Sequence, residues 1–207
     1  MTKACNALNT PMKSNQTKST QQQHHRQYGA SLIMVMMILI IVSLLGVGGA
    51  QIALMSERGA RNDRDMQVAW QAAEAALLDA EADMTNARKA VFDGKTRSAF
   101  LPGCGTSGTS KGLCDVTIAG KPAWLTVDFT DTDSDAPTTE FGAFSGNTYK
   151  TGSTGVQPAQ LPRYVIELVE DPLSKKNYVY RVTAMGFGPR VDIQAVLQMI
   201  YRTLNED

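Results

Sequence analysis

The pattern of apolar and polar positions is dominated by one long uncharged run near the N-terminus. No charged residue lies between Arg26 and Glu57, and positions 32–45 form a solid block of bulky apolar side chains. An α-helix rises about 1.5 Å per residue, so about 20 such residues cross the roughly 30 Å hydrocarbon core of a bilayer. Inside lipid a single segment satisfies its own backbone polar groups only as a helix. The pattern therefore predicts a membrane-spanning helix over residues 30–55.

The periodicity after this run predicts that the helix continues as an amphipathic segment over residues 56–92. Apolar residues recur at alternating steps of four and three, which is the spacing of one helix face. We expect this seam to pack on a β-sheet of the same chain, although a coiled-coil stripe has the same spacing. Asp93 and Gly94 provide a stop, since Gly is favoured at a helix C-terminus. The seam comprises Met66, Trp70, Ala73, Leu77, Ala80 and Met84, and it continues to Ala87 and Val91.

The rest of the chain, 93–207, predicts a β-rich globular domain. Segments 163–170, 178–185 and 191–202 are rich in Val, Ile and Tyr and are separated by turn residues, as in an antiparallel meander. Such a sheet needs one face covered, and the amphipathic helix is the obvious cover. On the last segment one face carries Val191, Ile193, Ala195, Leu197, Met199 and Tyr201.

Two shorter strands are expected at 115–119 and 123–129, where apolar and polar residues alternate. Residues 130–162 contain little apolar material, so they predict a long exposed loop and a candidate contact region. The fold class expected is therefore α+β. A long N-terminal helix, transmembrane in its first half and amphipathic in its second, packs on an antiparallel β-sheet.

Residues 1–29 form a basic leader that contains no acidic residue. Positive charge beside an apolar run stays in the cytoplasm, so the C-terminal bulk is predicted to be translocated. A secretory signal peptide also starts basic, but its apolar core spans only about 7–15 residues. Cleavage by signal peptidase at the small residues Gly46, Gly48, Gly49 and Ala50 is the alternative. The basic residues of the leader are Lys3, Lys13, Lys18 and Arg26.

Charge and composition weigh against nucleic-acid binding and catalysis. Without the leader the chain has 16 basic and 20 acidic residues, which gives no electrostatic footprint for nucleic acid. Both histidines, His24 and His25, lie in the leader, so the domain has no His for a Ser-His-Asp or Cys-His system. We therefore expect no enzymatic activity and no cofactor. The helix carboxylates Glu74, Asp79, Glu81 and Asp83 are interpreted as a solvated face.

Three acidic residues, Asp131, Asp133 and Asp135, are spaced like the first half of a calcium loop. Ala136 and Gly142 stand where an EF-hand needs Gly and Glu, so that motif is excluded. A weak, partly solvated calcium contact and a flexible acidic loop without metal are the two remaining interpretations.

The three cysteines divide between the two sides of the membrane. Cys5 lies in the cytoplasmic leader, whereas Cys104 and Cys114 follow the apolar run and lie ten residues apart. In an oxidising compartment the latter pair predicts a loop-closing disulfide that contributes about 2–3 kcal/mol. A zinc half-site is the alternative, but no third or fourth ligand is at hand.

At the junction between leader and apolar run, Gly29 ends the leader and the small residue Ala30 precedes the apolar helix. This junction resembles a class III prepilin signal. In that family a membrane aspartic peptidase cuts after the Gly and leaves the helix in place. The resemblance implies cleavage between Gly29 and Ala30, with the helix kept as membrane anchor and assembly helix. Its residues are Leu32, Ile33, Met34, Val35, Ile38, Leu39, Ile41, Leu44 and Leu45.

Three further motifs are ERGARNDRDMQVAWQAAEAALLDAE at 57–81, RYVIEL at 163–168 and YRVTAMGFG at 180–188. They resemble the PilX family of minor pilins and leave 93–162 unmatched. One departure concerns Met34, the fifth residue after Gly29, where most pilins carry Glu. A buried carboxylate in lipid is costly unless it is paired, so its absence removes both a cost and a docking group. By resemblance this favours a special position in the fibre over the repeating shaft.

The resemblance implies a pilin-like fold and a minor pilin that primes type IV pilus assembly at or near the tip, supporting twitching motility and adhesion. Implied partners are other minor pilins, the major pilin, the prepilin peptidase, inner-membrane lipid and a PilY-type tip protein. The implied location is the inner membrane, with one span and a periplasmic C-terminal domain, and then the fibre. Two alternatives are a pseudopilin of type II secretion and an inner-membrane-anchored periplasmic scaffold that never polymerises.

Overall fold

The computed structural model describes residues 30–117, 120–149, 155–171 and 177–203. The predicted leader, with Gly29 of the expected cleavage position, lies outside the described residues. The chain divides into two compact units, Met1–Ile52 and Ala53–Asp207. One long helix, α1 (Ala30–Ala82), contributes its first part to the first unit and the remainder to the second.

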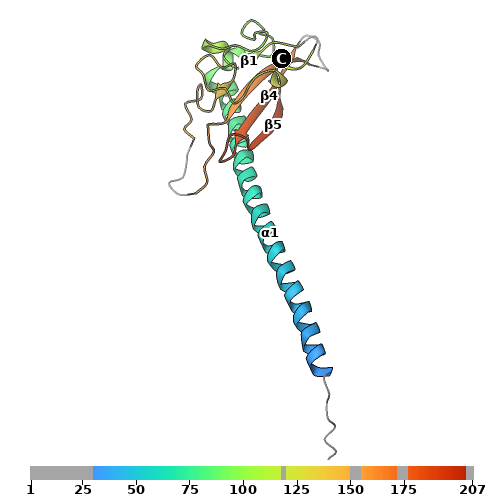
Figure 1. Ribbon diagram of the computed structural model, residues 1–207. Coiled ribbons are helices and arrows are strands. Elements are labelled where there is room, and N and C mark those ends of the chain that lie inside the picture. The colour runs from blue at the N-terminus through green and yellow to red at the C-terminus, as the bar shows by residue number, and fades with distance from the viewer. Residues whose placement is uncertain (1–29, 118–119, 150–154, 172–176, 204–207) are drawn as a thin grey trace, which may run out of the picture. The chain divides into compact units, whose positions relative to one another are not determined.

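Short helical turns and a five-stranded sheet follow α1 among the described residues (Figure 1). The turns are a π-helical turn η1 (Asp83–Ala87) and three 3-10 turns, η2 (Lys89–Val91), η3 (Gly108–Ser110) and η4 (Ala123–Leu125). The strands are β1 (Leu113–Cys114), β2 (Thr139–Glu140), β3 (Arg163–Glu170), β4 (Tyr178–Phe187) and β5 (Gln194–Tyr201).

In the first unit α1 is a continuous apolar helix. Within the described part of the chain it is the one helix long and apolar enough to cross a bilayer. Its bulky side chains are exposed, and its backbone groups are satisfied along the helix itself. This half of α1 therefore offers an apolar surface on every side.

The sheet of the second unit is built around β3. On one side β3 pairs antiparallel with β4 along its whole length, from Arg163↔Met185 to Glu170↔Tyr178. On its other side it pairs with the parallel β1 and the antiparallel β2. β5 continues the sheet beyond β4. The predicted meander is confirmed, with β4 extending to Phe187 and β5 confined to Gln194–Tyr201, while β1 makes the sheet mixed.

The main core lies between α1 and one face of the sheet. Alternate residues of β3 and β4 point to this face, as the two-residue period of a strand requires. Both layers are fully packed, which confirms the α+β arrangement of helix on sheet. The core includes Ala76, Ala80 and Met84 of the helical segment, Tyr164, Ile166 and Leu168 of β3, and Tyr180, Val182 and Ala184 of β4.

Small residues set the distance between α1 and the sheet. An added Cβ at Gly186 of β4 would lie 2.1 Å from the Ala69 carbonyl oxygen and 2.2 Å from the Ala73 nitrogen. The helix backbone therefore rests directly on the strand, where only glycine fits. Ala69, Ala72 and Ala73 are fully buried in this contact.

This close approach corrects the predicted seam. Met66 and Trp70 are 43% and 49% exposed, so their expected place between helix and sheet is wrong. Their side chains are too large for a contact made by alanine and glycine, and the packed face is rotated toward Ala69, Ala72 and Ala76. The remaining seam residues do contact the sheet side: Ala73, Ala80 and Met84 are buried and Leu77 is half-buried.

The opposite face of the sheet is covered by loop segments, and here the predicted strands are wrong. Residues 115–117 are not in a strand, 118–119 lie outside the described residues, and 123–129 begin with the 3-10 turn η4. Pro122 precedes this turn, and the Ala123 nitrogen donates to Glu167 of β3 instead of to a strand partner. The apolar residues of this covering layer form a second core with β3 and β4: Cys104, Cys114, Ala123, Phe129, Val165 and Phe187.

The segment 130–162 is more ordered than the predicted exposed loop. It contains β2, and Ala136, Thr138 and Thr139 are at most 1% exposed. The prediction of an exposed loop from the low apolar content is wrong here, because hydrogen bonds stabilise the buried polar residues. For example, the Thr139 hydroxyl donates to the Lys111 carbonyl oxygen at 3.0 Å. Residues 150–154 of this segment lie outside the described residues.

Substitution of Gly186 by Ala tests the close helix–sheet approach. The added methyl group collides with the backbone of α1, so the free energy of unfolding is expected to fall by about 1–3 kcal/mol or more. Denaturant unfolding of the chain in detergent measures this loss. The control is Gly59→Ala, where nothing lies within 4 Å and a gain of roughly 0.5–1 kcal/mol is expected. Unchanged stability of the Gly186 variant would contradict the contact.

Candidate functional site

The apolar half of α1 is the most extensive functional candidate. All nine residues predicted as membrane anchor and assembly helix lie on it, and each is more than half exposed. An uncharged helix with bulky side chains on all sides fits membrane anchoring, with the sheet-containing unit as the soluble domain. Met34 lies in this stretch and is 69% exposed. The predicted cleavage bond involves Gly29, outside the described residues.

At the other end of α1 a buried ion pair marks the change from α- to π-helix. Asp83 opens η1, and Arg88 follows its last residue. The Arg88 Nε donates to Asp83 Oδ1 at 2.8 Å, and a second guanidinium nitrogen donates to Asp83 Oδ2. The two side chains are 3% and 0% exposed. Two parallel charge-assisted hydrogen bonds and the low dielectric of the interior strengthen the attraction within such a pair, and this offsets the cost of desolvating its two charges.

The remaining polar groups of this pair are also satisfied. The third Arg88 nitrogen donates to the carbonyl oxygens of Thr109 and Lys111, both at 2.8 Å. The Tyr164 hydroxyl of β3 donates to Asp83 Oδ2 at 2.9 Å. Burial, reinforced by the Asp83 charge, raises the pKa of Tyr164 far above its ordinary value, so this phenol stays a donor. The ion pair thus joins the helix end, the segment around η3 and the sheet.

An aromatic contact extends the network to the segment after β2. The Arg88 guanidinium lies 3.7 Å from the centre of the Phe144 ring, within the range of a cation–π interaction. One helical turn before Asp83, the buried Asp79 carboxylate accepts hydrogen bonds from the same segment. Its donors are the Gly142 nitrogen at 2.8 Å, the Asn147 side-chain nitrogen at 2.9 Å and the Ser145 hydroxyl.

Two of the four helix carboxylates therefore contradict the predicted solvated face. Glu74 and Glu81 are exposed, but Asp79 and Asp83 are at most 1% exposed. The sequence holds a signal that would have found them: they lie four residues apart and alternate with the alanines that pack on the sheet. A short Asp side chain that lies between alanines on the sheet-packed face of a helix is buried as long as that packed face extends past it.

The disulfide between Cys104 and Cys114 is confirmed. Both cysteines are buried in the core on the outer face of the sheet, and Cys114 is a residue of β1. The bond therefore ties the segment that carries Thr109 and Lys111 to the sheet. Next to it, the Arg97 guanidinium pairs with Asp115 at 2.7 Å and lowers the pKa of that carboxyl group.

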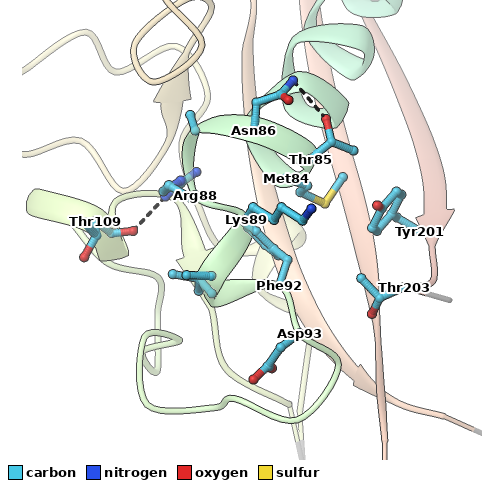
Figure 2. A pocket seen from close by; sticks show the side chains of 13 residues that line it. Met84, Thr85, Asn86, Arg88, Lys89, Phe92, Asp93, Thr109, Tyr201 and Thr203 are labelled. Carbon is cyan, nitrogen blue, oxygen red and sulfur yellow. Dashed lines mark hydrogen bonds between the residues drawn. The ribbon is translucent and has the colours of Figure 1, made fainter. Parts of the chain in front are cut away.

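A pocket of about 940 Å³ opens between segment 84–93 and the end of β5 (Figure 2). Figure 2 shows Tyr201 and Thr203 on one side and Met84 and Phe92 on the other. Its lining combines these side chains with Val91 and the stem of Lys89. Such a pocket suits an apolar group with a polar rim.

The acidic residues at 131–135 do not gather as metal ligands. Among the described residues no three His, Cys, Asp or Glu side chains come close enough to hold a metal ion. Asp131 instead accepts a hydrogen bond from the Asp133 backbone nitrogen at 2.9 Å, a local turn.

Comparison with protein families settles the family. A model described as PilX N-terminal matches residues 29–78, and one described as type IV pilus assembly protein PilX C-term matches residues 58–203. The chain belongs to the PilX family. The second match includes 93–162, which the sequence motifs left unmatched. Neither the comparison with curated proteins nor that with solved structures found a match.

Membership in the PilX family assigns the chain to type IV pilus assembly. This role is structural, which agrees with side chains engaged in packing, ion pairing and a disulfide. It also implies partners from pilus assembly in general. The PilX family thus accounts for both halves of the molecule, the apolar helix and the α+β unit.

Substitution of Asp83 by Asn tests the buried ion pair. The amide keeps the shape but leaves the Arg88 charge buried without a counter-charge, so unfolding is expected to become easier by about 3–5 kcal/mol. The matched control is Glu57→Gln, which breaks the exposed Arg61–Glu57 pair and costs less than about 1 kcal/mol. Denaturant unfolding compares the two variants. Equal losses of unfolding free energy in the two variants would mean that the buried pair contributes no more to stability than the exposed pair.

Removal of the disulfide is expected to lower the free energy of unfolding by about 2–3 kcal/mol. The double variant Cys104→Ala and Cys114→Ala frees the chain between them in the unfolded state. Unfolding with and without a reductant is the measurement. The reductant should reproduce the loss in the native chain and have no effect on the double variant. A reductant effect on the variant would assign the stabilisation to another cause.

Proposed function

We propose that this PilX-family chain is a minor pilin that primes type IV pilus assembly and enters the fibre at or near its tip. The observation that carries the proposal is one continuous helix with two different surfaces. Its first half is uncharged and apolar on every side, and its second half is packed on the sheet of a folded unit. In this role the chain supports twitching motility and adhesion and catalyses no reaction.

In the proposed mechanism the apolar half of α1 serves two purposes in succession. It first anchors the subunit in the inner membrane, with the second unit in the periplasm. When the subunit is drawn into the fibre, the same side chains pack against the helices of other pilins, so lipid contacts are exchanged for protein contacts. Gly46, Gly48 and Gly49 allow close approach of neighbouring helices there.

The proposed processing and partners follow from this mechanism. The prepilin peptidase removes the leader, residues 1–29, by cutting between Gly29 and Ala30. Three parts remain in the mature chain: the transmembrane segment 30–55, the amphipathic segment 56–92 and the globular domain 93–207. Other minor pilins and the major pilin are the fibre partners, and a PilY-type protein is the partner at the tip. Met34 supports a special position, since it provides no carboxylate to pair with a neighbouring terminal amine.

Mass measurement of the mature N-terminus tests the processing. We expect a chain that begins at Ala30 and therefore lacks Cys5, together with accumulation of the full-length precursor when Gly29 is replaced by Val. The conservative replacement Gln27→Asn in the leader is the control and leaves processing intact. A native chain that still begins at Met1, or that begins near Gln51, would contradict the pilin proposal.

The two alternatives are separated by where the protein is found and what its loss affects. A minor pilin is expected in sheared surface fibres, and its deletion abolishes twitching. A pseudopilin would instead be needed for secretion of exoproteins. A permanent scaffold would be missing from sheared fibres while the membrane pool stays full.

A further inference from the structure

β5 (Gln194–Tyr201) is the last strand of the sheet and has one open edge. It pairs with β4 on one side, and no described residue pairs with its other side. Every second residue of an antiparallel strand points its N–H and C=O away from its paired neighbour. The eight residues of β5 therefore present about 26 Å of unpaired backbone.

This edge lacks the features that normally protect one. Proteins block their sheet edges with charged residues, proline, bulges or a covering segment. The sequence QAVLQMIY of β5 contains no charged residue, no proline and no glycine, and its pairs with β4 run without interruption from Phe187↔Gln194 to Tyr180↔Tyr201. A strand of this composition is typical of segments that pair with another chain.

Apolar side chains lie next to the open edge on the outer face of the sheet. Val196 and Ile200 are 43% and 64% exposed. Val196 lies opposite Met185 of β4, and Met185 packs against the outer core. The apolar surface therefore continues from the covering layer, across β4, to the open edge.

On the helix face the pocket described above lies at the C-terminal end of the same strand. Tyr201 and Thr203 line it together with Met84, Val91 and Phe92 (Figure 2). Alternate side chains of a strand point to opposite faces. A strand added beside β5 would thus place some side chains next to Val196 and Ile200, and one of the others beside this pocket.

A second copy of the chain is a poor occupant of this edge. Closed two-fold pairing of one edge with its own copy is antiparallel, about an axis perpendicular to the sheet. Because α1 lies on the sheet, from Ala69 to Ala80, the helix of the second copy would run the opposite way. The Ala53 ends of the two packed helices would therefore point in opposite directions, whereas the proposed function requires both chains to enter the same membrane.

We propose that β5 is completed by a strand from a different protein of the assembly complex. The occupant is an extended segment of about eight residues without charged side chains toward Val196 and Ile200, and with a bulky apolar side chain at the pocket. This inference deepens the proposed function and rests on it for the setting in which the partner is met.

Site-specific photo-crosslinking of the full-length chain in pilus-forming cells tests the proposal. A benzophenone amino acid is placed in turn at Val196, Gln198 and Ile200, which lie on one face of β5. Mass spectrometry of the digested products locates the residue reached on the partner. For a paired strand, the site on the partner moves by two residues, in one direction, for each two-residue step along β5. Capture of a protein without this stepping does not support the proposal.

The controls are the same probe at Val191 and at Leu78, which are 40% and 67% exposed but lie outside β5. They are expected to give no stepped series. The proposal is overturned if the β5 probes give no crosslinks above these controls, or if the sites on the partner do not follow two-residue steps.

A pair of charge variants provides the second measurement. Val196→Lys combined with Ile200→Lys gives the edge the protection that it lacks, and the crosslink yield at Gln198 is expected to fall about tenfold, the factor for loss of one strong contact. Leu78→Lys is the matched control and leaves the yield unchanged. Denaturant unfolding checks that each variant is folded. An unchanged yield in the folded double variant would also overturn the proposal.

The same strains separate this inference from the proposed function. Mature N-terminus and presence in sheared fibres are measured alongside each crosslink. A stepped series from a chain that never enters fibres keeps the strand pairing and rejects the minor-pilin role. A processed chain in fibres without a stepped series keeps the role and rejects the pairing.

Discussion

The second unit of this protein depends on one buried ion pair. Desolvating Asp83 and Arg88 costs several kcal/mol per charge, and the cost is offset only because the geometry is matched and every remaining polar group has a partner. Those partners come from β3, through Tyr164, and from the segment around η3, through Thr109 and Lys111. Helix end, loop and sheet can therefore adopt only one mutual arrangement without leaving a charge unpaired. The disulfide reinforces this arrangement by fixing to the sheet the segment whose carbonyl groups Arg88 requires.

The two halves of α1 carry different side chains, each suited to a different environment. In its first half bulky side chains without charge lie on all sides, which suits lipid or the helices of other subunits. In its second half Ala69, Ala72 and Ala73 make the backbone itself the contact surface against Gly186. Family membership places the chain in type IV pilus assembly, and this division of the helix fits membrane anchoring with the sheet-containing unit as the soluble domain.

The parts of the fold that were predictable follow from strong local signals. The residue pattern of β3 predicted its first and last residues correctly. The uncharged run predicted the apolar helix. The disulfide followed from compartment and pairing, without any geometry. The prediction of a strand at 123–129 was wrong, because apolar and polar residues also alternate in a loop whose apolar side chains pack against a sheet. In that case a tertiary hydrogen bond to Glu167 replaces the strand ladder.

The candidate site was harder to predict because it depends on distances between segments far apart in the sequence. Met66 and Trp70 satisfy the helical period, but the approach of Gly186 favours the neighbouring alanine face, and no single-helix pattern contains that information. Asp79 is buried only because Gly142 and Asn147 bring donors to it. The open edge of β5 likewise becomes visible only when the order of the strands is known.

The way α1 lies on the sheet has a mechanical consequence. A pull applied at the Ala53 end of the helix acts along the contact surface, so the contacts at Ala69, Ala73 and Ala80 resist it together instead of separating one after another. The Cys104–Cys114 disulfide prevents the segment between these two cysteines from extending when the subunit is under tension. Because forced unfolding is governed by the unfolding rate, the resistance of this subunit to tension depends on how many of these contacts must break together.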